Sequence, residues 1–163
     1  MVERDDGIDF ALAAFREAGD WQVQDLAHDQ LGDVETISHA LRRLPGDGGA
    51  VALVAVDEDF FVIVRVVGVA TRVLLSDVTA AEDWDLAESA LEFLGLPELE
   101  LEDEQNQVPA GDLDLLGDLG FQELEMGMLL DDVDLYPDEL LSDVARRLGF
   151  GEQFDDAVGL TSA

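Results

Sequence analysis

Two runs of β-branched and aromatic residues near the middle of the chain limit its possible folds more than any other feature. Ala50 to Val56 and Phe60 to Val67 are rich in valine, and only Asp57, Glu58 and Asp59 separate them. This composition is typical of strands, and the short acidic connection predicts a central hairpin. Because nearly every residue is apolar, both faces should be largely buried, and Arg65 must then reach an edge, the solvent or a carboxylate.

The segments on either side of this hairpin predict further strands and helices. Alternating apolar residues predict a strand over 9–17, and the turn residues Gly19 and Asp20 lead into a return strand over 21–26. Helical spacing of apolar residues follows over 34–44, with Asp33 as the candidate N-cap. A short strand is predicted at 72–75 and a helix at 84–94.

This order of elements predicts an α+β fold. Residues 1–96 read β-β-α-β-β-β-α, which indicates a mainly antiparallel five-stranded sheet with packed helices. Residues 97–111 hold two prolines and several acids, and are interpreted as an acidic linker or mobile loop. Residues 112–163 form a small C-terminal helical region, with helices predicted at 113–119, 122–130 and 137–148 and a last turn or two near 152–158.

Charge restricts the possible partners. The chain of 163 residues has 39 acidic and eight basic residues, for a net charge of −31, and every basic residue is arginine. Such a field repels phosphate and anionic lipid, so direct binding to nucleic acid or to a membrane is not expected, whereas a basic protein surface fits. Residues 98–163 hold 19 acids and two arginines, net −17, and therefore carry the denser negative charge.

A plainer explanation of the acidity stays open. The carboxylates could serve solubility alone, or reflect a salt-adapted or GC-biased proteome, which would also favour arginine over lysine. In either case, crowded carboxylates destabilise the compact state, so added salt is expected to raise stability.

No pattern in the sequence indicates a catalytic centre. The chain has no cysteine, and its two histidines, His28 and His39, lie in no nucleophile or metal motif. Aspartates gather at 112–118 and 131–138, but counting from Asp132 puts Pro137 where a calcium loop of the EF-hand type needs glycine. We therefore expect neither an enzyme nor a bound cofactor or metal.

The expected location is the cytoplasm. The N-terminus has no apolar run of the kind that a secretory signal needs, and no apolar segment is long enough to span a membrane.

The stretch before the 137–148 helix is the candidate partner interface. It surrounds one leucine and one tyrosine with aspartates, as in an interface core with a polar rim. Alternatively, these two apolar residues could staple the helix into its own core. The candidate residues are Asp131, Asp132, Asp134, Leu135, Tyr136 and Asp138.

Residues 111–154 contain the sequences DLDLLGDLG, DLYPDELL and ARRLGFGEQF, and RVLLSD at 72–77 follows the central hairpin. With these segments the chain resembles, over most of its length, the bacterial tRNA adenosine deaminase-associated proteins. This resemblance implies a small acidic protein linked to the enzyme that converts adenosine to inosine in the tRNA anticodon. No catalytic residues carry over, and the zinc motif of the deaminases themselves is missing.

The leading hypothesis is therefore a non-catalytic partner or modulator of a tRNA adenosine deaminase. One alternative is a nucleic-acid mimic that binds a different basic protein. Another is an enzyme that uses carboxylates and a divalent metal, which calcium or magnesium should stabilise against heat.

Overall fold

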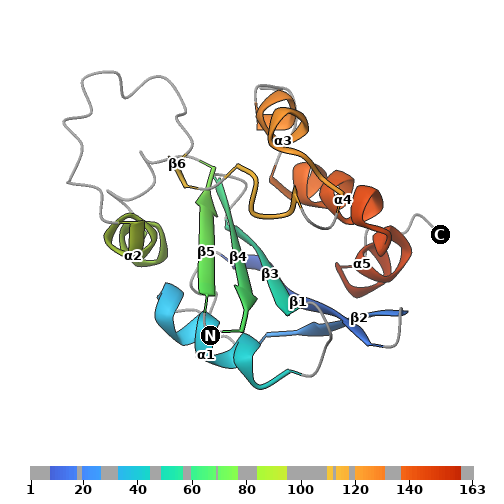
Figure 1. Ribbon diagram of the computed structural model, residues 1–163, viewed down its shortest axis with the longest axis horizontal. Coiled ribbons are helices and arrows are strands. Elements are labelled where there is room, and N and C mark those ends of the chain that lie inside the picture. The colour runs from blue at the N-terminus through green and yellow to red at the C-terminus, as the bar shows by residue number, and fades with distance from the viewer. Residues whose placement is uncertain are drawn as a thin grey trace.

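The computed structural model shows an antiparallel sheet with helices on both faces (Figure 1). It describes residues 8–17, 20–26, 33–44, 49–56, 60–68, 70–76, 84–94, 110–111, 113–117, 120–130 and 137–158. The strands are β1 (Ile8–Glu17), β2 (Asp20–Asp25), β3 (Ala50–Val56), β4 (Phe60–Val67), β5 (Ala70–Leu75) and β6 (Ala110–Gly111). The helices are α1 (Val34–Arg42), α2 (Asp85–Leu94), α3 (Glu123–Leu130), α4 (Pro137–Leu148) and α5 (Gly151–Val158).

The strand order is β2-β1-β3-β4-β5-β6, and every neighbouring pair is antiparallel. Strands β3 and β4 form the predicted central hairpin. Because β1 lies between β2 and β3, the connection through α1 joins two strands that run parallel but are not neighbours. The α+β class and the five predicted antiparallel strands are confirmed. The two-residue β6 adds a sixth at the β5 edge, within the stretch predicted as a linker.

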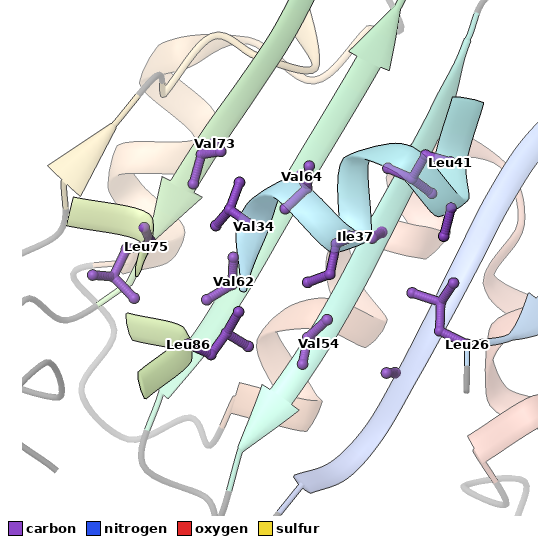
Figure 2. Packing of buried hydrophobic residues seen from close by; sticks show 14 of the residues in the cluster. Leu26, Val34, Ile37, Leu41, Val54, Val62, Val64, Val73, Leu75 and Leu86 are labelled. Carbon is purple, nitrogen blue, oxygen red and sulfur yellow. The ribbon is translucent and has the colours of Figure 1, made fainter. Parts of the chain in front are cut away.

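Helices α1 and α2 cover one face of the sheet. Figure 2 shows Ile37 and Leu41 of α1 lying over the strands, with Ile37 near Val54 of β3 and Val62 of β4. All four side chains are 1% exposed or less. Burial of such side chains is the main favourable term in folding, and it explains why alternate residues of the central strands are apolar on this side.

Asp33 caps the start of α1, as predicted. Its side-chain oxygen Oδ1 accepts a hydrogen bond from the backbone N–H of Thr36 at 2.8 Å. This bond holds the pKa of Asp33 below its ordinary value of 3.8, because it stabilises the charged carboxylate. The cap satisfies one of the helix's free N–H groups.

Helices α3, α4 and α5 cover the opposite face (Figure 1). Leu141 and Val144 of α4 belong to the same buried cluster as the strand residues on this side. Trp21 of β2 donates its indole N–H to the carbonyl oxygen of Leu148 at 3.1 Å, and its ring lies 4.7 Å from that of Phe150. With helices on both sides, the central strands are buried on both faces, as their composition predicts. The division into a 1–96 domain and a 112–163 helical region stays a prediction.

The described part of one predicted helix is not α-helical. Of the helix predicted over 113–119, residues 113–116 form turns and Gly117 is in a 3-10 conformation. Gly120, which follows it, has a φ of 107°, a conformation that favours glycine and is incompatible with a right-handed helix. The buried side chain of Arg65, only 3% exposed, donates to the carbonyl oxygen of Leu115 at 3.1 Å. The sequence left open which group the buried guanidinium of Arg65 would reach. In the structure it donates to a backbone carbonyl of this turn.

Candidate protein-interaction site

The predicted interface lies between α3 and the start of α4, almost entirely outside the described residues. Asp131, Asp132, Asp134, Leu135 and Tyr136 lie outside the described residues, and so does the side chain of Asp138, whose backbone belongs to α4. The predicted interface therefore stays a prediction. The helices on either side of this segment, α3 and α4, are described, and they carry a second candidate surface.

Helix α3 begins with a hydrogen bond between the backbone and a glutamate side chain. Gln122 precedes the first helical residue, and its backbone N–H donates to Oε1 of Glu125 at 3.0 Å. A glutamate at the third helical position that reaches back in this way is one half of a capping box. The side chain of Gln122 also donates to the carbonyl oxygen of Gly117 at 3.2 Å. These bonds fix where α3 starts and join it to the preceding turn.

Arg147 of α4 holds α3 in place. Its guanidinium lies 3.2 Å from Oε2 of Glu125 and donates through Nε to Asp143 at 3.0 Å. The same group lies 5.7 Å from the centre of the Phe121 ring, within the range of a cation–π contact. Because these side chains are partly exposed, each ion pair stabilises only weakly. Together they orient α3 on α4.

The apolar residues of α3 point in two opposite directions. Met126 is fully buried, and Leu129 and Leu130 pack beside it against the core. Leu124 and Met128 are 75% and 66% exposed. At about 100° per residue, these two lie within roughly 40° of each other and face away from Met126. We call Leu124 and Met128 the α3 ridge.

Acidic side chains border the α3 ridge. Glu123 and Glu125 belong to the same helix, and their positions, about 100° from Leu124 on either side, flank the ridge. Glu123 is exposed, and Glu125 is partly exposed and pairs with Arg147. An apolar centre with charged residues around it has the anatomy of a protein interface.

The residues considered for chemistry are not brought together in the described part of the chain. His39 is exposed on α1, whereas His28 lies outside that part. Asp114, from the first aspartate cluster, is exposed, and its Oδ1 lies 3.7 Å from Nη1 of Arg72. Among the described residues, no group of three or more histidine or acidic side chains is arranged to hold a metal ion.

Sequence reasoning predicted α3 but missed its exposed side. The signal was present, because residues 123–130 read ELEMGMLL, in which five of the eight residues are apolar. A narrower apolar stripe is enough to cover a core, so apolar residues on both sides of a helix predict that some of them are exposed.

The fold and this surface together define a class: a three-layered α+β protein that presents an apolar helix ridge among acidic side chains. The chain belongs to the Rv3753c-like tRNA adenosine deaminase-associated protein family, whose model matches residues 9–151. It is 40% identical over 151 residues to Protein Rv3753c of Mycobacterium tuberculosis, an alignment that covers 91% of this chain and 87% of that protein. The resemblance noted in the sequence is thus confirmed.

No solved structure matches the chain. Within the described ranges, none of the helices has the length and apolar character needed to span a bilayer.

Proposed function

We propose that this protein is a non-catalytic binding partner of a tRNA adenosine deaminase and docks on the basic, tRNA-facing side of that enzyme. Family membership carries the proposal, because the family is described as associated with this enzyme. The net charge of −31 supports it. We expect the complex to form in the cytoplasm, together with the tRNA substrate.

The electrostatic reasoning starts from the substrate. A protein that binds tRNA neutralises phosphates with lysine and arginine side chains, so its binding face is basic. This chain is repelled by tRNA and attracted by such a face. Complementary fields raise the association rate more than the affinity, and salt screens them. A protein docked there competes with tRNA for the enzyme, and so modulates access of the substrate.

A binding titration tests the proposal. The fluorescently labelled chain is titrated with the deaminase at about 0.05 M and about 0.15 M salt, where the Debye length is longer and shorter respectively. We expect saturable binding that weakens as salt rises, and displacement of the chain by tRNA. Polyglutamate of similar charge is the control for nonspecific attraction. Absence of binding at the lower salt concentration rules the proposal out.

The dense charge of residues 98–163, net −17, favours one alternative, a nucleic-acid mimic that binds a different basic protein. A mimic relies on general attraction, so polyanions should displace it from several basic proteins with similar efficiency. A dedicated partner should prefer the deaminase over basic proteins of equal charge. The same titration, repeated with lysozyme or a histone as the basic protein, separates the two.

A further inference from the structure

The α3 ridge is an apolar surface with a rigid support. Its two side chains are one helical turn apart and mostly exposed, while the opposite side of the same helix is anchored in the core. The buried side chain of Met126 anchors the helix, and the contacts of Glu125 and Arg147 help to orient it before any partner arrives. Binding therefore loses little backbone entropy, and methionine adapts readily to the shape of a pocket.

The acidic side chains beside the α3 ridge restrict which partner surface can cover it. In a second copy of this chain, each ridge would bring Glu123 towards another acidic surface, and each copy carries a net charge of −31. Like charges at an interface disfavour association. A groove that takes apolar side chains and has lysine or arginine along its border complements both features.

We propose that the α3 ridge inserts into an apolar groove with a basic border on the deaminase, and that this contact sets how long the complex lasts. The inference rests on the proposed function and deepens it by naming the contact surface. Attraction between the acidic chain and the basic border raises the association rate, and burial of the α3 ridge lowers the dissociation rate. Buried apolar anchors surrounded by a polar border are the residues that usually dominate binding energy.

The double substitution Leu124→Ala and Met128→Ala tests the contact. Each truncation should weaken binding to the deaminase about tenfold if the side chain is buried in the complex. The loss should appear as faster dissociation with an unchanged association rate, because the charge is unchanged. Phe93→Ala is the matched control: Phe93 is also an exposed apolar residue, at 41%, but it lies on α2 across the sheet. It should alter affinity less than twofold.

Surface plasmon resonance gives both rates, and thermal melting checks that the variants are folded. If the wild-type chain binds and the double variant dissociates at the same rate, the ridge is not the contact, whereas the proposed function survives. If the wild-type chain does not bind the deaminase, the inference about the ridge and the proposed function both fail. Analytical ultracentrifugation tests whether a second copy of the chain covers the ridge instead. If the wild-type chain is a dimer and the double substitution makes it a monomer, the ridge is a dimer contact and the inference is overturned.

Discussion

The two tryptophans lie on opposite faces of the sheet, and they make the coupling between its two helical layers measurable. Trp21 contacts the end of α4, whereas Trp84 packs against the cluster formed with α1 and α2, with its ring 6.1 Å from that of Phe60. We predict that damage to one layer lowers the stability reported by the tryptophan of the other. Both layers depend on the same strands, so neither can lose its packing alone.

Val144→Ala is the perturbation. Val144 is fully buried in α4, and the substitution removes two methyl groups. At about 0.8 kcal/mol for each buried carbon, with an added term for the cavity, the cost is about 2 kcal/mol. For a chain of this length, the melting temperature should fall by roughly 4–8 °C.

The assay uses Trp21→Phe, which leaves Trp84 as the only tryptophan, and Trp84→Phe, which leaves Trp21. Urea unfolding is followed by fluorescence with and without Val144→Ala in each background. We expect the same decrease in unfolding free energy from both probes, with coincident midpoints, as a two-state protein requires. A transition at Trp84 that does not move, while that at Trp21 shifts, would refute the reasoning and show that the layer of α3, α4 and α5 unfolds independently of the layer of α1 and α2.

Three further predictions concern stability. Asp33→Ala removes the α1 cap and should cost about 1 kcal/mol at neutral pH. Because the folded pKa of Asp33 is lowered, this difference is fully present above pH 3.8 and should vanish as the pH falls through the folded value in a pH series of urea unfolding, whereas Asp33→Asn, which also caps but does not titrate, should match the wild type at neutral pH and keep its capping stabilisation at low pH. Added sodium chloride should raise the melting temperature, since it screens repulsion among the 39 carboxylates, and a melting temperature independent of salt would contradict this. Gly111→Ala should destabilise by roughly 2 kcal/mol, because φ is 118° at this position and a Cβ would collide with the carbonyl oxygen of Val73, so an unchanged calorimetric melting curve would show that the β5–β6 pairing is unimportant.

Local patterns predicted the sheet well. The valine-rich runs of β3 and β4, the alternation in β1 and the Asp33 cap are each determined by neighbouring residues, so a sequence reveals them. Strand order depends on contacts between distant segments, and no local pattern shows that β1 lies between β2 and β3. The same holds for β6, because a two-residue strand has no periodicity of its own.

The candidate site was harder to predict for a different reason. Apolar residues such as Leu124 and Met126 look alike in a sequence, and only the packing of α3 shows that one is exposed and the other buried. The role of Arg147 depends on Glu125, 22 residues away, so spacing within one helix does not reveal it. Charge, by contrast, is additive over the chain, and the sequence alone supports a cationic partner.

Strand β2 ends the sheet, and such an edge can in general recruit a strand from another molecule and start aggregation. Here the strand begins and ends with aspartate, at Asp20 and Asp25. A second molecule adding to this edge would bring its own carboxylates against them. Repulsion between these carboxylates therefore opposes the growth of fibrils from this edge.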